Sequence, residues 1–387
     1  MKITDVRSLV LQYDLDEHLG YSQQYFTKRT CHLVQVFTDD GLTGVGEAFG
    51  GGNVAFANAA IVEKVLKPMV LGRDPREIAV IWHEVYNILR DHGQKGMSMQ
   101  ALSGLDIALW DILGKATGLP LYRLLGGPFR TRFKAYGYAM MFRKVPDLVS
   151  AFEREAASVR EKGFTATKMK VGMGVAQDLA LATAVRRGAG EGFKAMADAN
   201  HAYMAGEAIQ LGRGLRDLGF YWFEEPVAPE DYEGYREVKA ALPGIHIAGG
   251  EAEFSRWGFR ELLGRRCVSI VQPEVCGLGG ISEYLKVQAL ASAFGVPVIP
   301  HVWGSAVAVA MNMHLIAALP DAPGGMHQFE PMLEYDTTPN HFREKLITEP
   351  LDVLGQVKAS SGWVTVRDKP GLGVALDEAF VKKYRVN

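Results

Sequence analysis

The chain has 387 residues, of which 48% are hydrophobic and 22% charged, and its formal net charge at pH 7 is −2. This composition is typical of a folded globular protein and excludes an intrinsically disordered chain. A charge so near zero provides no basic surface for nucleic acid and no polybasic membrane anchor, so we expect neither partner. The length allows two domains, or one large barrel with an appended cap.

Three features of the sequence predict a cytoplasmic location. The cysteines Cys31, Cys267 and Cys276 are too few and too scattered for a disulfide framework. The first residues, MKITDVRSLVLQ, lack the charged, apolar and small-residue order of a signal peptide. The longest apolar stretch, AVAVAMNMHLIAAL, is interrupted by Asn312 and His314 and is too short to span a bilayer.

Residues 1–130 are predicted to form an α+β unit. Alternating apolar residues in ITDVRSLVLQ, HLVQVFTD and TGVGEAF predict three strands, and three segments between residues 53 and 118 have helical spacing. A polar connection at residues 14–30 is either a lid, which would bring His18 and Tyr21 to a substrate, or a wandering link between strands. The glycine-rich residues 50–53 form either a second flap or a turn into a helix.

From residue 131 onward, strand and helix patterns alternate, which predicts parallel strands joined by crossover helices. Seven apolar runs each end at an ionisable residue, and these endpoints recur every 23 to 29 residues: Lys170, Asp198, Glu224, Glu251, Glu274, His301 and Glu330. A barrel of about 250 residues has eight strand–helix units of roughly 30 residues, with its active site at the carboxyl ends of the strands. An open doubly wound sheet would instead gather such residues at one switch point.

These endpoints therefore predict a barrel over residues 131–330 with one reaction centre at its mouth. After Glu330 the alternation is lost, and FEPMLEYDTTPNHF is interpreted as a loop. Residues 331–387 are predicted to return to the N-terminal unit.

The acids Asp198, Glu224 and Glu251 end three successive predicted strands, so their carboxylates should lie around one point. Without a counter-charge they would raise one another's pKa values. A divalent cation removes this difficulty, and an all-oxygen ligand set suits Mg²⁺. The alternative is that these acids form salt bridges with lysines of the barrel. The adjacent Glu225 is expected to face away and to have a structural role.

The lysines Lys168 and Lys170 share one face of their strand, because side chains in a strand repeat with period two. Two neighbouring ammonium groups lower each other's pKa, which would make one of them a usable base near neutrality. His301 lies opposite Lys170 around a barrel and could exchange a proton on the other side of a substrate, with Glu274 holding its ring. The alternatives are a solvated lysine pair and a core histidine.

Three further residues are predicted to touch the substrate. Glu330 ends the eighth predicted strand, and in its protonated form it would donate a hydrogen bond to a developing oxyanion. Asn200 and His201 directly follow Asp198, which places them at the same mouth.

Seven motifs in this order resemble the mandelate racemase subgroup of the enolase superfamily over essentially the whole chain: KMK at 168–170, DAN at 198–200, FEEP at 223–226, GGE at 249–251, QPE at 272–274, PHVWG at 300–304 and FEP at 329–331. The resemblance implies an α/β fold, a modified (β/α)7β barrel with an N-terminal α+β cap that the C-terminal tail completes. It also implies a homo-oligomer. Other stretches look most like galactarolactone cycloisomerases and related acid-sugar enzymes.

The resemblance also implies residue roles. Asp198, Glu224 and Glu251 would hold one Mg²⁺, and Lys170 would be the base. Lys168 would contact the substrate carboxylate, His301 would be the opposite acid or base, and Glu330 would donate to the enolate.

The chain departs from the family pattern at Glu274, where the family usually has aspartate after QP. A changed contact to His301 weakens a racemase, which needs matched bases on two faces, more than an elimination. The expected function is removal of the proton α to the carboxylate or lactone carbonyl of a sugar acid, followed by β-elimination, in a dehydratase or lactone cycloisomerase. The alternatives are a racemase or epimerase and, outside enzymes, a non-catalytic barrel that binds acid sugars.

Overall fold

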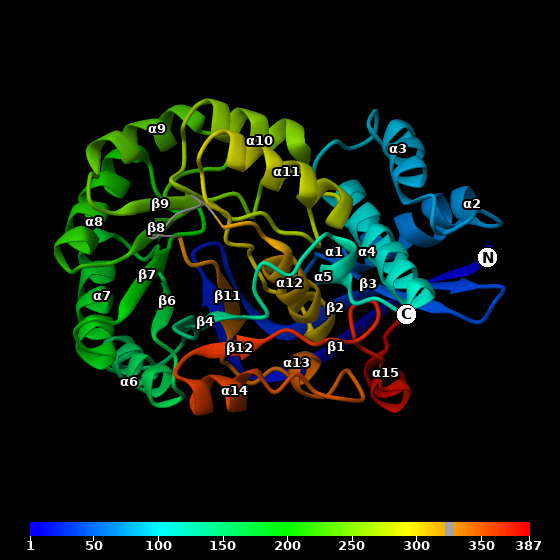
Figure 1. Cartoon of the computed structure of the whole chain (residues 1–387). Helices are drawn as coiled ribbons and strands as arrows, with labels where there is room; N and C mark the ends of the chain where they lie inside the picture. Colours follow the sequence, from blue (N-terminus) through cyan, green and yellow to red (C-terminus); the bar gives the residue numbers. More distant parts are fainter. Residues whose placement is uncertain (322–328) are drawn as a thin grey trace.

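The computed structural model describes residues 1–321 and 329–387, which form a capping domain beside a curled parallel sheet (Figure 1). The sheet of the cap has the strand order β3-β2-β1-β5, with β1 Ile3–Tyr21, β2 Gln24–Thr38, β3 Thr43–Ala48 and β5 Phe142–Arg143. Its helical elements are α1 Val54–Ile61, the π-helical turn η1 Val62–Leu66, α2 Lys67–Val70, α3 Ile78–Leu89, α4 Met97–Thr117 and α5 Leu121–Leu124.

Two glycines let β3 lie directly against α4. A Cβ atom on Gly44 would lie 2.1 Å from the carbonyl oxygen of Ala108, and one on Gly46 would lie 2.1 Å from that of Gly104. Any other residue would push the helix away from the strand, because real Cβ atoms do not approach that closely. The close contact fixes the end of β3, which carries Glu47.

The second sheet is the wall of the barrel, as predicted. Its strands are parallel, in the order β10-β9-β8-β7-β6-β4-β11. Isolated bridges from Val271 to Val298 and from Glu274 to His301 add one further segment next to β10. The strands are β4 Arg132–Tyr138, β6 Ala166–Lys170, β7 Lys194–Asp198, β8 Trp222–Glu224, β9 His246–Gly249, β10 Ile270–Val271 and β11 Met332–Asp336.

Each wall segment contributes one buried side chain to a common layer inside the barrel. The members of this layer are Tyr136, Ala166, Met196, Trp222, Ala248, Ile270, Ile299 and Met332. Because side chains in a strand repeat with period two, the next inward layer lies two residues further along each strand. That layer contains polar residues, and it forms the floor of the site described below.

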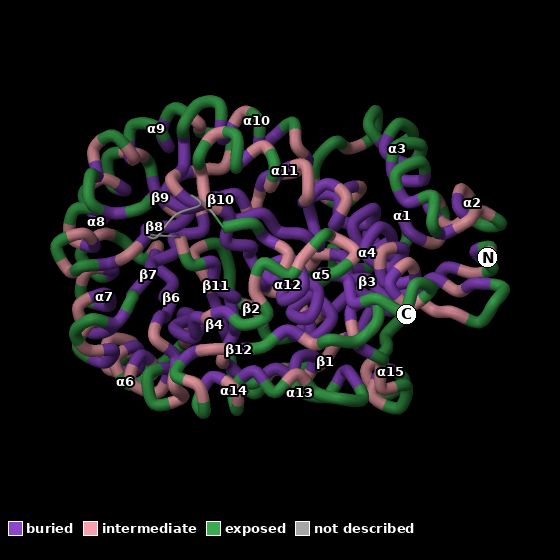
Figure 2. The backbone as a smooth tube through the Cα atoms, in the orientation of Figure 1, coloured by how far each residue is buried: buried purple, intermediate pink, exposed green. Residues whose placement is uncertain are grey.

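Helices cover the outside of the barrel, and exposed residues lie along them as well as on the cap and the tail (Figure 2). Local capping starts three of them: Asp147 accepts a hydrogen bond from the Ser150 N–H (2.9 Å), Asp231 one from the Gly234 N–H (2.9 Å), and the Ser305 hydroxyl one from the Val307 N–H (3.1 Å). In residues 1–321 and 329–387, no helix combines the length and apolarity that a membrane crossing requires. The outer helices are α6 Leu148–Glu161, α7 Val175–Ala189, α8 Ala205–Asp217, α9 Tyr232–Ala241, α10 Ser255–Gly264, α11 Ile281–Ala293 and α12 Ala306–Ala318.

The interpretation of FEPMLEYDTTPNHF as a loop was wrong, because it contains β11 and the start of a short helix. β11 is the last strand of the barrel and pairs in parallel with β4. The remaining tail pairs with the base of β4 through β12 and then reaches the cap, where the Val386 N–H donates to the Val10 carbonyl (2.9 Å). Its elements are α13 His341–Glu344, α14 Val353–Ser360, β12 Trp363–Thr365 and α15 Glu378–Tyr384.

Both alternatives for residues 14–30 assumed a connection outside the strands. The structure shows instead that these residues are part of the sheet. They extend β1 and β2 into a long antiparallel hairpin that turns between Tyr21 and Gln24. Near its tip, Leu19 and Gly20 pair with β5, which follows the first barrel strand. The hairpin therefore carries the cap sheet to the mouth of the barrel. The glycines at 50–52 form the turn that precedes α1.

Candidate active site

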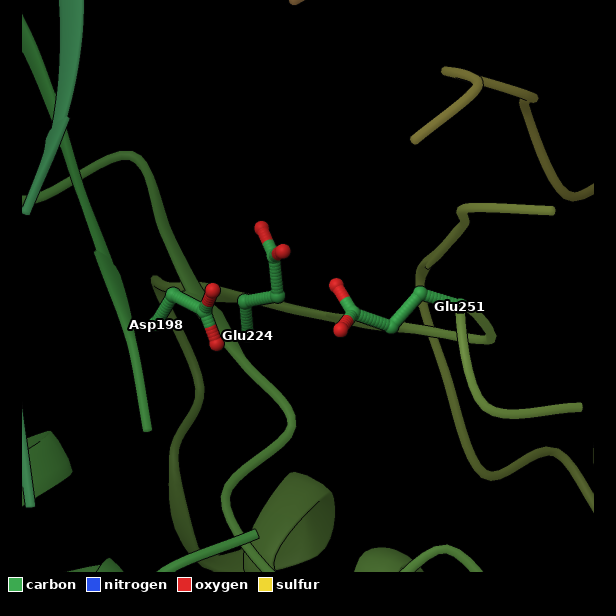
Figure 3. Close-up of side chains that lie close together, drawn as sticks. All are labelled: Asp198, Glu224 and Glu251. Atoms are coloured by element: carbon green, nitrogen blue, oxygen red, sulfur yellow. The ribbon is translucent and has the colours of Figure 1, made fainter. Parts of the chain in front are cut away.

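Three carboxylates converge at the mouth of the barrel. Asp198 ends β7, Glu224 ends β8, and Glu251 follows β9 by two residues. One oxygen of each lies within 4.8 Å of the others, and the three side chains point toward one another (Figure 3). Asp198 and Glu224 are fully buried, whereas the Glu251 side chain keeps 18% of its exposure.

Both lysines of β6 point into the same space, as period two predicts. The Lys168 Nζ lies 2.6 Å from Glu224 Oε1 and 2.7 Å from Glu334 Oε1, and Lys170 forms an ion pair with Asp198. Salt bridges between the predicted metal ligands and barrel lysines therefore exist, but no lysine pairs with Glu251 in the described part of the chain.

These ion pairs set the protonation of the site. Burial disfavours charge on Lys170, but the Asp198 carboxylate outweighs burial and raises the pKa of Lys170. Burial would raise the pKa of Asp198, yet Lys170 and Lys168 together lower it. For Glu224, burial outweighs the attraction of Lys168 and raises the pKa to about 7. The contact with Lys168 is thus not enough to keep the pKa of Glu224 at its ordinary value.

Glu334 occupies the place predicted for Glu330. Glu330 is exposed and precedes the strand, so its predicted place at the end of the eighth strand was wrong, and its contact with the enolate stays a prediction. The buried Glu334 lies two residues after Met332 of the inner layer, and it accepts hydrogen bonds from Lys168 and from the Val302 N–H (2.9 Å). Burial would raise the pKa of Glu334, but Lys168 and His301 lower it, so its side chain is a carboxylate. The alternation within MLEYD was the signal that could have identified it.

His301 and Glu274 form a direct pair. The Nδ1 of His301 lies 2.6 Å from Glu274 Oε2, and its Nε2 lies 3.1 Å from Glu251 Oε2. Glutamate therefore reaches the imidazole from the position where the family usually has aspartate. Burial disfavours the imidazolium, but Glu251, Glu334 and Glu274 outweigh burial and raise the pKa of His301 to about 10.

The predicted substrate contacts lie at unequal distances from the carboxylates. Asn200 donates from Nδ2 to Glu251 Oε1 (3.2 Å), and the half-buried His201 follows it. The Tyr21 ring centre lies 5.9 Å from Lys170 Nζ, which places the tip of the hairpin next to Lys170. His18 is exposed on β1, so its role stays a prediction.

Two further inward residues were not predicted. Gln272 donates from Nε2 to Glu224 Oε2 (2.9 Å) and helps to orient that ligand. Tyr138 ends β4 with its ring centre 5.1 Å from Lys170 Nζ, and its hydroxyl is buried without a partner. Gln272 opens the QPE motif and Tyr138 belongs to no motif, and the place of both residues in the inward layer reveals their contacts.

The donor set fits a divalent cation. It consists of carboxylate oxygens, which Mg²⁺ prefers. Glu251 Oε2 is buried without a hydrogen-bond partner, although His301 lies near it. Glu225 is also buried at the mouth, not turned away from it, and burial followed by repulsion from Glu251 and Asp198 raises its pKa well above the usual value. A cation would offset this excess of carboxylates.

Comparison with known proteins identifies the family. Residues 151–380 match the model "Enolase C-terminal domain-like", and residues 19–126 match "Mandelate racemase / muconate lactonizing enzyme, N-terminal domain". The chain belongs to the mandelate racemase and muconate lactonizing enzyme family of the enolase superfamily. It is therefore an enzyme, and the resemblance read from its motifs is confirmed.

Similar proteins are aligned with almost the whole chain. It is 42% identical over 386 residues to D-galactarolactone cycloisomerase of Agrobacterium fabrum, covering 100% of this chain and 99% of that one. The structure of 3,6-anhydro-D-galactonate cycloisomerase from Zobellia galactanivorans is 33% identical, with 100% of both chains covered and a TM-score of 0.88. L-talarate/galactarate dehydratase from Salmonella typhimurium LT2, liganded with Mg and L-lyxarohydroxamate, is 29% identical, with 100% of this chain and 93% of that chain covered and a TM-score of 0.86.

The comparisons support the prediction of magnesium. The Salmonella structure is liganded with Mg, and Asp198, Glu224 and Glu251 provide the acidic triad that could hold the ion here.

Proposed function

We propose that this enzyme removes the proton α to the carboxylate or lactone carbonyl of a sugar acid and then expels an oxygen from the β-carbon. One observation carries the proposal: Lys170 and His301 lie at opposite ends of the row of carboxylates. Lys170 pairs with Asp198 and His301 contacts Glu251, with Glu224 between these ligands (Figure 3). The names of the similar proteins, which are cycloisomerases and a dehydratase of sugar acids or lactones, support it.

In this proposal Lys170 begins the reaction as the base. When magnesium is bound, it supplies positive charge that engages Asp198, Glu224 and Glu251 and favours negative charge on a substrate oxygen. With Asp198 turned to such a cation, repulsion from the nearby Lys168 would favour the neutral amine of Lys170, whose proton would pass to solvent. Lys170 takes the α-proton, and the electron pair of the broken C–H bond forms the C=C bond of the enediolate.

Lys168 and His301 act on the two oxygens that change charge. Glu334 is a carboxylate and cannot donate a hydrogen bond, so the Lys168 ammonium that it holds is the donor to the enediolate oxygen. As the enediolate collapses, the bond between the β-carbon and its oxygen breaks. His301, protonated through its contacts with Glu251 and Glu274, gives a proton to the departing oxygen.

The departing oxygen decides the type of reaction. If it is a hydroxyl group, water is lost and the enzyme is a dehydratase. If it is a ring oxygen, the ring opens without loss of atoms and the enzyme is a cycloisomerase. The 42% identity with the Agrobacterium enzyme makes sugar lactones the first compounds to test.

We also propose a homo-oligomer that works in a reducing compartment such as the cytoplasm. The resemblance to the family supports the first statement, and the three buried, unpaired cysteines support the second. The absence of nucleic-acid and membrane partners stays a prediction from composition.

A screen in D₂O tests the proposed reaction. The enzyme is incubated with Mg²⁺ and a panel of mono- and diacid sugars and their lactones, and products are identified by NMR. We expect a keto acid with deuterium at the carbon that lost its oxygen, and no product from the Lys170→Ala variant. Recovered substrate of inverted configuration, carrying deuterium at the α-carbon, would mean an epimerase instead.

A further inference from the structure

The end of the cap strand β3 holds the start of a barrel helix. Glu47 of β3 accepts hydrogen bonds from the Ser305 N–H (2.9 Å), the Ser305 hydroxyl (2.6 Å) and the Ala308 N–H (3.1 Å). Ser305 directly precedes α12, so a carboxylate of one domain satisfies the free N–H groups of a helix in the other. Glu47 is buried, which makes these contacts costly to lose.

The loop held in this way is the one that carries His301. Gly304 leaves room for Glu47, because a Cβ atom there would lie 2.6 Å from Glu47 Oε1. From the other side, the buried Arg343 donates to the carbonyls of Gly304 and Val302, both at 2.9 Å. The backbone that follows His301 is therefore fixed between the cap and α13.

The same strand end also contacts the partner of His301. The Phe49 N–H donates to the Cys276 carbonyl (2.8 Å), and the Cys276 N–H donates to Glu274 Oε1 (2.7 Å). The Phe49 ring lies edge-on to the imidazole of His301, with centroids 6.0 Å apart and an interplanar angle of 77°. Residues 47–49 thus touch both loops that form the histidine–glutamate pair.

We infer that Glu47 is a positioning residue for His301 and Glu274, so that the capping domain sets the angle of the imidazole. The kinetic consequence rests on the proposed function, in which His301 protonates the departing oxygen. Loss of the Glu47 charge would leave the start of α12 and the His301 loop with weaker restraints. Lys170, on the opposite side of the carboxylates, has no contact with β3 in the described chain and would keep its geometry.

Two matched variants test this inference in the magnesium-loaded enzyme. Glu47→Gln keeps the size of the side chain but loses its charge and one accepting oxygen. Asp111→Asn makes the same kind of change at another buried carboxylate of the cap, which accepts from the Val45 N–H (3.0 Å) and the Leu372 N–H (2.8 Å). Both variants should lose stability, but only the first lies against the His301 loop.

In D₂O, Glu47→Gln should form product about 10–100-fold more slowly, the usual loss when a supporting contact of a reacting group is removed. Lys170 would still remove the α-proton, so the ratio of deuterium in recovered substrate to product formed should rise. Ser305→Ala, which removes only the hydroxyl contact with Glu47, should change this ratio in the same direction by less. An unchanged ratio in Glu47→Gln, or an equal rise in Asp111→Asn, would overturn the inference.

A spectrum separates this inference from the proposed reaction. Ring ¹⁵N signals of the labelled holoenzyme report on each imidazole, and the His301→Asn variant assigns the His301 signals. We expect Glu47→Gln to shift them and Asp111→Asn to leave them in place. Unshifted signals in Glu47→Gln would overturn the positioning role, even if the reaction is as proposed. A shift in an enzyme that eliminates no sugar acid would support positioning and count against the proposed reaction alone.

Discussion

Lys168 contributes to the folded state and to the proposed chemistry through the same contacts. Its ammonium is buried between Glu224 and Glu334, at 2.6 and 2.7 Å. A buried charge is tolerated only when it is paired and hydrogen-bonded. Because both partners are themselves fixed, Glu224 by Gln272 and Glu334 by the Val302 N–H, the ammonium has one position. That position faces the carboxylates at the mouth.

The two glutamates near β11 give a paired prediction. We expect Glu334→Gln to lower kcat/KM by on the order of 10²–10³, because Lys168 loses the carboxylate that holds it as an oxyanion donor. Glu330→Gln changes an exposed side chain before the strand and should leave kcat/KM unchanged. Steady-state kinetics on the best substrate of the screen measures both. A larger loss of kcat/KM in Glu330→Gln than in Glu334→Gln would favour Glu330, the residue predicted from the sequence, as the one that acts on the enolate.

Stability below neutral pH should depend on His32 of β2. Burial lowers the pKa of this imidazole from 6.5 to about 4, with its Nε2 3.0 Å from the Ser8 hydroxyl. The unfolded chain therefore binds the proton at higher pH than the folded protein. The stabilisation is complete above pH 6.5 and is lost as the pH falls from 6.5 toward 4.

Urea unfolding at pH 7 and pH 5 measures this dependence. Wild type should lose roughly 2 kcal/mol more free energy of unfolding between these pH values than His32→Gln. Substitution of the exposed His83 by glutamine should leave the wild-type dependence in place. Equal losses in wild type and His32→Gln would show that His32 is not a neutral buried group.

At the scale of elements, local patterns predicted most strand ends but not the last one. Runs such as KMK and FKAMAD carry their own period-two signal, and Lys170, Asp198 and Glu224 end strands as predicted. MHQFE at 326–330 has a similar pattern, but residues 326–328 lie outside the described chain, and the described strand begins at Met332. The place of β11 in the barrel comes from its pairing with β4, in which Glu334 lies beside Tyr136. The register between two strands almost 200 residues apart cannot be predicted from either segment alone.

The outer part of the β1–β2 hairpin was not predicted as strand, for a related reason. Its outer part, DLDEHLGYSQQYFTKR, is polar and rich in charge, which is typical of a connection. Contacts made elsewhere stabilise it as strands: Leu19 and Gly20 pair with β5, and the tip bonds to the loop after β7. A single sequence does not reveal such tertiary support.

The tip of this hairpin yields a prediction about substrate binding. The Ser22 hydroxyl (2.9 Å) and the Gln23 amide (3.0 Å) both donate to the Asn200 carbonyl. The double variant Ser22→Ala, Gln23→Ala should raise KM on the order of 10-fold, since two net hydrogen bonds that dock the tip are lost, and should change kcat little. Gln12→Ala removes a hydrogen bond to Thr30 in the same hairpin and should leave KM as it is. An unchanged KM in the double variant would show that the tip is not part of the binding site.

At the scale of the whole molecule, one buried ion pair joins the cap to the barrel. Arg29 of β2 lies 2.8 Å from Asp336 at the end of β11, and both side chains are buried. Breaking such a pair from one side typically costs about 3–5 kcal/mol, because the remaining charge stays buried. We expect that loss in the free energy of unfolding of Asp336→Ala.

An exposed ion pair provides the comparison. Glu153→Ala removes the partner of Arg187, which lies 2.7 Å away on the surface, and should cost less than about 1 kcal/mol. Urea unfolding of both variants gives the two values. Similar losses would mean that Arg29 and Asp336 do not join the domains energetically.

The division into cap, barrel and returning tail could be predicted from the order of strand and helix patterns. The contacts between these parts could not. Glu47 stands in an ordinary strand pattern, TGVGEAF, and its partners Ser305 and Ala308 lie more than 250 residues away. Only the packing of β3 on α4 and beside the barrel brings them together.

Diffraction from crystals grown with manganese in place of magnesium tests the shared site most directly. We predict one anomalous peak bounded by the carboxylates of Asp198, Glu224 and Glu251, with the Lys170 ammonium displaced from Asp198. A peak at another place, or three carboxylates that ligate no ion at saturating manganese, would contradict a single reaction centre at the mouth of the barrel.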